Sequence, residues 1–195
     1  MSTWSSSLAR RCLAAAGWKV LNQPLPGPKA VVVFYPHTSN WDFVFGILAR
    51  AVIQLPASFA AKDSLFAWPH GALFRSLGGV AVNRRERSGF VGQMAQQFKE
   101  RPSFYLAIAP EGTRRLTPGW KSGFYRLAQE AQVPLALAFI DYAQREVGIL
   151  GYVQICGDAE RDFANIRAAY AGRQGRHPQQ QGPIALWAAQ PRDDA

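Results

Sequence analysis

A chain of 195 residues, 48% of them hydrophobic, is long enough for one domain with a substantial core. The formal net charge is +9, and only five of the 22 basic residues are lysines, which favours planar arginine contacts with phosphate or carboxylate groups. Nucleic acid, an anionic membrane surface and phosphorylated small molecules are therefore the candidate partners. Cys12 and Cys156 are isolated, which excludes a zinc signature and a disulfide framework, and no run approaches the roughly 20 apolar residues of a membrane span.

The N-terminal residues 4–20 are expected to form a short amphipathic helix, followed by a proline-rich linker, so that residues 1–28 precede the main domain. The candidate anchors of this helix in a membrane interface are Trp4, Leu8, Leu13 and Trp18. A helix packed on the body of the domain is an equally good interpretation of the same pattern.

Beyond the linker, strand-like runs alternate with helical stretches. Strands are expected at 30–35, 58–61, 80–82, 104–109, 134–140 and 147–155, and helices at 41–53, 70–77, 88–100, 122–132 and 158–170. This alternation predicts a single α/β domain, residues 29–172, with a mixed, mostly parallel sheet flanked by helices. The last two strands are close enough to form an antiparallel hairpin. Residues 173–195, rich in Gln, Pro and Gly, are expected to form a loose tail.

The most informative motif is the hexapeptide His-Thr-Ser-Asn-Trp-Asp, which lies between an apolar strand and an apolar helix. Ser39 or Asn40 can cap the helix, which leaves His37 in a loop at the carboxyl edge of the sheet, where α/β proteins place their chemistry. With the turn intervening, Asp42 can fold back and bond one imidazole nitrogen, so that the other can take a proton from a hydroxyl. A structural His–Asp pair is the alternative that the hexapeptide alone leaves open.

A second loop, Pro-Glu-Gly-Thr-Arg-Arg, follows another apolar strand. Gly112 lets backbone amides face a ligand, Thr113 adds a hydroxyl and Arg114 adds a planar fork, and together these predict a phosphate-binding loop. Lys121, at the start of the next helix, can reach the same anion or be a surface charge. The alternative for the loop is a polar turn in which Glu111 pairs with an arginine.

A third segment is the strand Gly-Gly-Val-Ala-Val-Asn-Arg, which ends at Arg84. In the expected sheet, Arg84 and Arg114 leave the same edge near His37. Arg85 and Arg87 are better explained as a solvated basic turn.

Taken in chain order, these segments resemble the glycerolipid acyltransferase family, of the 1-acylglycerol-3-phosphate acyltransferase type. The resemblance covers about residues 30–141 and rests on four features: the His-x4-Asp block at His37 and Asp42, the strand ending at Arg84, the Glu-Gly-Thr-Arg block at Glu111–Arg114, and the Val133-Pro134 strand. Three residues depart from the family's usual ones, namely Pro36 for Asn, Ala81 for an aromatic residue and Arg115 for Ser. The His–Asp pair is intact, whereas Ala81 and the arginines lie where the acceptor headgroup would be read.

The resemblance implies an O-acyltransferase of phospholipid biosynthesis. His37 would be the general base that deprotonates a hydroxyl of the acceptor, and Asp42 would fix its tautomer. The acyl group would come from acyl-CoA or acyl carrier protein as co-substrate, with no cofactor and no metal. The acceptor phosphate would be held by Arg84, Glu111, Gly112, Thr113, Arg114 and Lys121, with Glu111 orienting an arginine.

Several alternatives follow from the same residues. The implied acceptor is 1-acylglycerol-3-phosphate, and a non-phosphate lysolipid such as an aminolipid is the alternative. With a membrane lipid as partner, the protein is expected peripherally on the inner face of the cell membrane. The two isolated cysteines agree with a reducing compartment. A non-catalytic membrane-binding module is disfavoured by the intact His–Asp pair, and a nucleic-acid-binding module by the absence of a recognised motif in the sequence; no nucleic acid partner is expected.

Overall fold

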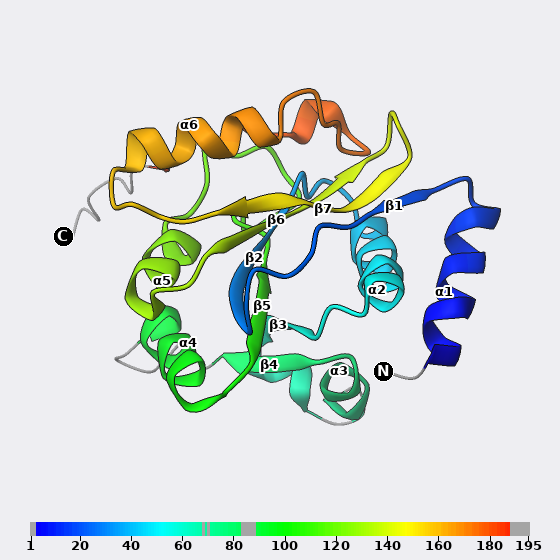
Figure 1. Cartoon of the computed structure of the whole chain (residues 1–195), viewed down its shortest axis with the longest axis horizontal. Helices are drawn as coiled ribbons and strands as arrows, with labels where there is room; N and C mark the ends of the chain where they lie inside the picture. The colour runs from blue at the N-terminus through cyan, green and yellow to red at the C-terminus, as the bar shows by residue number, and fades with distance from the viewer. Residues whose placement is uncertain (1–2, 68, 70, 83–88, 188–195) are drawn as a thin grey trace.

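A computed structural model describes residues 3–67, 69, 71–82 and 89–187, and it contains a seven-stranded sheet with helices on both faces (Figure 1). The strands are β1 (Lys19–Leu21), β2 (Lys29–Tyr35), β3 (Ala57–Lys62), β4 (Gly79–Val82), β5 (Phe104–Ile108), β6 (Leu135–Asp141) and β7 (Glu146–Val153). The helices are α1 (Thr3–Ala15), α2 (Trp41–Ile53), α3 (Gly71–Ser76), α4 (Gly89–Glu100), α5 (Gly123–Ala131) and α6 (Ala159–Ala169), with short 3-10 turns η1 (Asp63–Phe66) and η2 (Pro178–Gln180).

The strand order is β1-β7-β6-β2-β5-β3-β4, and the central pairs are parallel. Among the described strands, the β6–β7 pair alone is antiparallel, which confirms the predicted hairpin and the predicted mixed, mostly parallel α/β fold. The N-terminal region differs from the prediction. Its helix ends early, because Gly17 takes a left-handed conformation with φ of 76°, and residues 19–21 then pair with β7 as β1.

The two faces of the sheet carry side chains of different size. Large residues of β2, β5 and β6 pack under α4, α5 and α6, among them Val31, Leu106, Leu135, Leu137 and Phe139. The face toward α2 receives the alternate residues, and many of these are alanines: Ala30, Ala107, Ala136 and Ala138. Because side chains alternate along a strand, a pattern such as Leu-Ala-Leu-Ala makes one face bulky and leaves room on the other.

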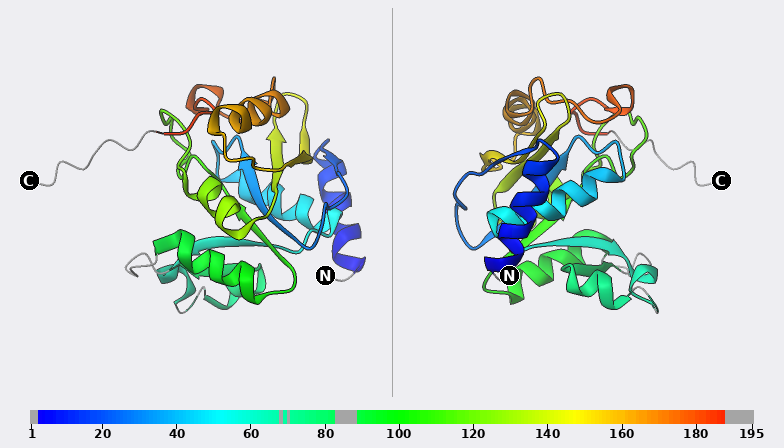
Figure 2. Two further views of the ribbon diagram at one scale, coloured as in Figure 1. Left: turned by 60° about the vertical axis from the view of Figure 1, so that its left-hand side comes forward. Right: turned by 90° about the vertical axis from the view of Figure 1, so that its right-hand side faces the viewer.

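Helix α1 packs on the body of the domain beside α2 (Figure 2). Ala9, Leu13 and Trp18 are buried there, and the Trp18 ring stacks on Phe45 with 4.2 Å between centroids. Two of the four candidate anchors, Leu13 and Trp18, are therefore core residues, whereas Leu8 is 60% exposed. The Trp4 side chain lies outside the described residues. None of the described helices is long and apolar enough to cross a bilayer.

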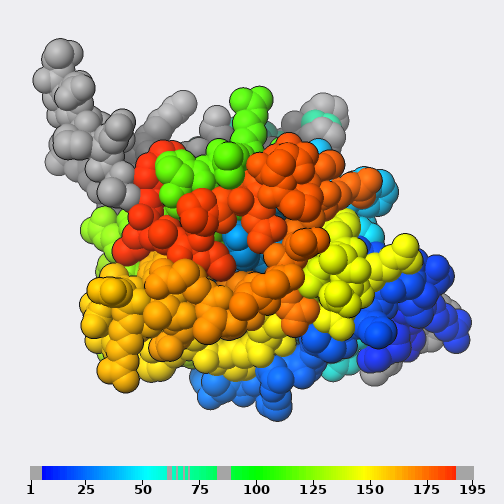
Figure 3. Space-filling view, turned by 90° about the horizontal axis from the view of Figure 1, so that it is seen from above, coloured from blue at the N-terminus to red at the C-terminus, as the bar shows by residue number. Residues whose placement is uncertain are grey.

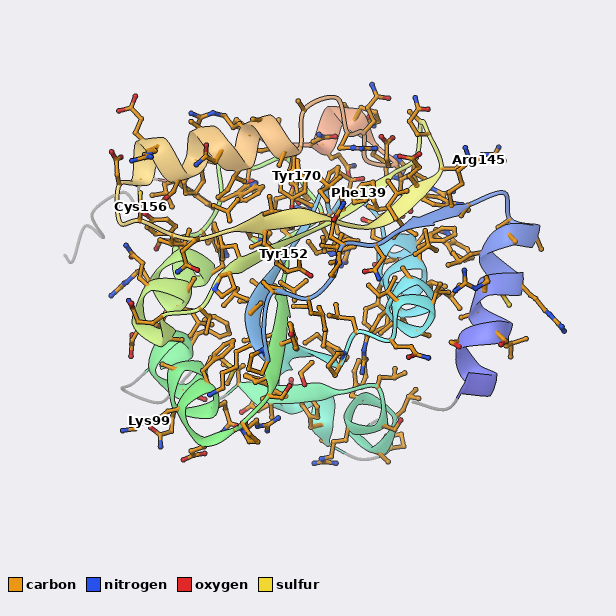
Figure 4. The ribbon with its side chains drawn as sticks, in the orientation of Figure 1. Lys99, Phe139, Arg145, Tyr152, Cys156 and Tyr170 are labelled. Atoms are coloured by element: carbon orange, nitrogen blue, oxygen red, sulfur yellow. The ribbon has the colours of Figure 1, made fainter. Side chains whose placement is uncertain are left out.

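The C-terminal residues up to 187 spread over the upper surface in orange and red (Figure 3). Tyr170, at the end of α6, points down to the sheet (Figure 4), where its hydroxyl lies 2.8 Å from the Val33 carbonyl oxygen and 2.9 Å from that of Ala138. Further along, the Trp120 amide donates to the Ala185 carbonyl at 2.7 Å. Residues 173–187 are thus packed on the domain, which differs from the expected loose tail, because their backbone finds partners in the loops beyond β2 and β5. The rest of that expected tail, residues 188–195, lies outside the described residues.

Candidate active site

The loop after β2 brings His37 and Asp42 together. The Nδ1 atom of His37 lies 3.2 Å from Oδ2 of Asp42, which belongs to the first turn of α2. The same oxygen accepts the amides of Thr38 and Ser39, each at 2.8 Å, so the carboxylate holds the turn as well as the imidazole. The Ser39 hydroxyl accepts the Trp41 amide at 3.2 Å, whereas Asn40 is the N-cap residue of α2 and makes no side-chain capping hydrogen bond. His37 also lines the cavity described below, and Nε2 is the ring nitrogen that Asp42 does not engage.

Tyr142 completes the surroundings of Asp42. Its hydroxyl donates to Oδ1 of Asp42 at 2.7 Å, from the turn between β6 and β7. Burial and the adjacent carboxylate raise the pKa of Tyr142, so this hydroxyl keeps its proton and remains a donor. Sequence reasoning missed this contact, and no local pattern signals it, because the two residues are 100 positions apart.

Glu111 lies beneath the loop rather than at its surface. Its side chain is fully buried, and Oε2 accepts the His37 amide at 2.7 Å. Burial raises the pKa of Glu111 to about 7; the His37 and Gly182 amides lower it and the nearby Asp42 carboxylate raises it. Glu111 was expected to orient an arginine. Instead it ties the two motif loops together, because β2 and β5 are parallel neighbours and their carboxyl ends meet.

The remaining loop residues lie at the surface beside His37. Gly112 has φ of 69°, and a Cβ there would lie 2.9 Å from Nζ of Lys121, so a glycine allows the lysine side chain to lie across the loop. Thr113 and Arg114 are exposed, and the Thr113 hydroxyl accepts the Arg115 amide at 3.4 Å. Arg84 lies outside the described residues.

A cavity of about 830 Å³ connects these groups, a volume within the range of ligand sites. Its mouth is lined by His37, Asp42, Gly112, Thr113, Arg114 and Lys121. Its deeper part runs between α2 and the sheet, lined by apolar and small residues that include Val32, Gly46, Ile53, Ala57, Ala107 and Ala138. Within the described part of the chain, no three His, Cys, Asp or Glu side chains gather as a metal site requires.

A histidine paired with a carboxylate at the mouth of a cavity, basic loop residues beside it and an apolar interior together suit an enzyme that acts on amphipathic substrates. The sequence matches the family model described as Acyltransferase over residues 19–138. The chain therefore belongs to the acyltransferase family, which confirms the resemblance and the O-acyltransferase class that the motifs indicated.

The 1-acyl-sn-glycerophosphate (LPA) acyltransferase PlsC from Thermotoga maritima is a solved structure with a similar fold. The match has a TM-score of 0.58 and 17% identity, and it covers 88% of this chain and 80% of that chain. At that identity the likeness concerns the fold. No match was found among curated protein sequences.

The buried Glu111 should make stability depend on pH. Between pH 4.5 and about 7 the folded protein holds a proton on Glu111 that the unfolded chain releases, because burial raises the pKa of this group, so the free energy of unfolding falls as pH rises through this window. A glutamine at this position would still accept the His37 amide but could not titrate. Urea unfolding should therefore be measured for both proteins at the two ends of the window. From the lower to the higher pH, the free energy of unfolding of Glu111→Gln should rise relative to that of the wild type by on the order of 2 kcal/mol. A difference in unfolding free energy between the two proteins that does not change with pH would contradict the raised pKa of Glu111.

Proposed function

We propose that the protein transfers a fatty acyl group from a thioester donor, acyl-CoA or acyl carrier protein, to a hydroxyl of 1-acylglycerol-3-phosphate in phospholipid biosynthesis. The observation that carries this proposal is one continuous cavity, which begins at the His37–Asp42 pair and the basic loop and continues as an apolar channel behind α2. A substrate of this class needs the same three surroundings: a base, an anion site and an apolar pocket.

In the proposed reaction, Nε2 of His37 takes the proton of the acceptor hydroxyl as its oxygen attacks the thioester carbonyl. The tetrahedral intermediate then expels the thiolate, which takes this proton from the imidazolium, so an ester and a free thiol are formed. Asp42, bonded to Nδ1, fixes the tautomer and stabilises the imidazolium. No side chain forms a covalent intermediate, so the acyl group moves in one transfer.

The acceptor phosphate is proposed to bind at the exposed loop beside His37. Gly112, Thr113, Arg114 and Lys121 line the mouth of the cavity, where their amide, hydroxyl and cationic groups suit a phosphate. Arg84 remains a proposed member of this group. Glu111 is better placed to hold the loops than to touch an anion, because its side chain is fully buried.

The acceptor is tested by product identification. The wild-type protein, given labelled acyl-CoA or acyl carrier protein and a panel of lysolipids, should acylate 1-acylglycerol-3-phosphate at least about tenfold faster than neutral or amine-bearing lysolipids. The reason is that the phosphate alone gains the contacts at the mouth. Faster turnover of an aminolipid would replace the proposed acceptor with the alternative one, while leaving the acyltransferase chemistry in place.

The apolar channel is proposed to hold the acyl chain being transferred. Ala107→Leu places about three more carbons in the channel, where free space should keep the cost to stability below the roughly 1–3 kcal/mol of ordinary overpacking. We expect transfer of a palmitoyl group to fall about tenfold and transfer of a butyryl group to change little. Equal losses for both chain lengths, with unchanged thermal unfolding, would exclude this location for the chain.

The edge that carries the site is also proposed to rest on the cytoplasmic face of the cell membrane. Trp41, Phe43 and Val44 are 53%, 42% and 43% exposed in the first turn of α2, and exposed Arg114 and Leu116 follow on the neighbouring loop. Apolar side chains among cations suit an anionic lipid surface. Donor and acceptor would then enter the cavity from the bilayer side.

Vesicle sedimentation tests the membrane surface. The wild type should bind vesicles containing phosphatidylglycerol more tightly than pure phosphatidylcholine, and Trp41→Ser should weaken binding several-fold. Leu25→Ser is the matched control. Leu25 is also an apolar residue that is 43% exposed, but it precedes β2, whereas Trp41 follows the other end of that strand. Equal effects of the two substitutions would rule out this face.

A further inference from the structure

The loops that carry His37 and Arg114 are bridged from above by the C-terminal segment. In the amide orientation that satisfies its neighbours, the side-chain nitrogen of Gln180 lies 3.2 Å from the carbonyl oxygen of Thr38 and 2.7 Å from that of Arg114. One amide group thus donates to a residue next to the proposed base and to a residue of the proposed phosphate loop. It belongs to η2, far beyond either loop in the sequence.

The segment around Gln180 is itself held firmly. The His177 amide donates to the Thr38 hydroxyl at 3.2 Å, and the Tyr142 amide donates to the Gln174 carbonyl at 2.9 Å. Gly175 lies so close to the His37 loop that a Cβ there would be 2.7 Å from Oγ1 of Thr38. The bridging amide is therefore presented from a fixed backbone, not from a free chain end.

Its other end is anchored below the site. The Tyr35 hydroxyl donates to the Gly182 carbonyl at 2.9 Å, and the Gly182 amide lowers the pKa of the buried Glu111 carboxyl group. Glu111 in turn accepts the His37 amide. The two motif loops are consequently joined twice, by Glu111 from beneath and by Gln180 from above.

We propose that Gln180 is a positioning residue, which sets the distance between the His37 base and the phosphate-binding loop at Arg114. This inference rests on the proposed phosphorylated acceptor, since only such an acceptor must reach both loops at once. An acceptor without the phosphate contacts His37 alone, so its rate of acylation does not depend on the spacing of the two loops. Loss of the bridge should therefore reduce the preference for phosphate, beyond any general loss of activity.

Steady-state acylation tests this with three variants and two acceptors, 1-acylglycerol-3-phosphate and monoacylglycerol. Gln180→Ala should lower kcat/KM for the phosphorylated acceptor about tenfold and leave monoacylglycerol within about twofold. Gln180→Glu keeps the size but places a carboxylate against two carbonyl oxygens, and it should lose at least as much. Gln179→Ala is the control, because Gln179 is an exposed residue of the same type in the same turn.

The outcomes separate the two proposals. If the wild type acylates the phosphorylated acceptor and Gln180→Ala has the same kcat/KM values as Gln179→Ala, only the positioning role is overturned. Equal losses on both acceptors, with lowered urea stability, also overturn it, because they show a merely structural contact. A wild type with no transfer to the phosphorylated acceptor overturns the proposed function, and this inference with it.

Discussion

The arrangement of the site depends on the burial of one carboxylate. Asp42 is 1% exposed, and an unpartnered carboxylate in such a place would be costly. Its surroundings supply the amides of Thr38 and Ser39, the Tyr142 hydroxyl and the His37 imidazole. Because these groups come from the β2–α2 turn and the β6–β7 turn, satisfying Asp42 fixes the turn geometry, and the turn geometry places His37 at the cavity.

A second buried carboxyl group extends this constraint to the neighbouring strand. Glu111 follows β5, and its contact with the His37 amide joins the loop that carries His37 to the loop that carries Arg114. The parallel pairing of β2 with β5 makes that contact possible, since the carboxyl ends of parallel neighbours lie at one edge. Two short motifs whose contacting residues are 74 positions apart thus form one surface.

Much of the fold followed from patterns within single segments. Strand and helix boundaries lay close to the expected ones, and α2 matched at both ends, because apolar periodicity and short connections govern these elements locally. The loops of His37 and Arg114 were expected at one edge for the same reason. The cavity had a signal as well, in the alternation of alanine with large residues along β6, but its meaning becomes clear only when α2 covers that face.

Other features depend on contacts between distant residues, and no local pattern predicts these. Tyr142 meets Asp42 across 100 positions, and Gln180 meets Thr38 across a longer interval. Composition also misled the prediction for the C-terminal segment, because Gln and Gly there are used for hydrogen bonds and close approach rather than for flexibility. The partner of Glu111 was misjudged in the same way, since burial and not charge pairing decides its neighbour.

His37 and Asp42 are proposed to act as one catalytic unit, and the rest of the mechanism depends on this. The most direct measurement is a double-mutant cycle on the acyl transfer rate with His37→Ala, Asp42→Asn and the combined variant, each checked for folding by circular dichroism. We predict a loss of about a thousandfold or more for His37→Ala, and no further loss when Asp42→Asn is added, because Asp42 acts through His37. Independent losses that multiply in the double variant, or a His37→Ala variant with full activity, would contradict this.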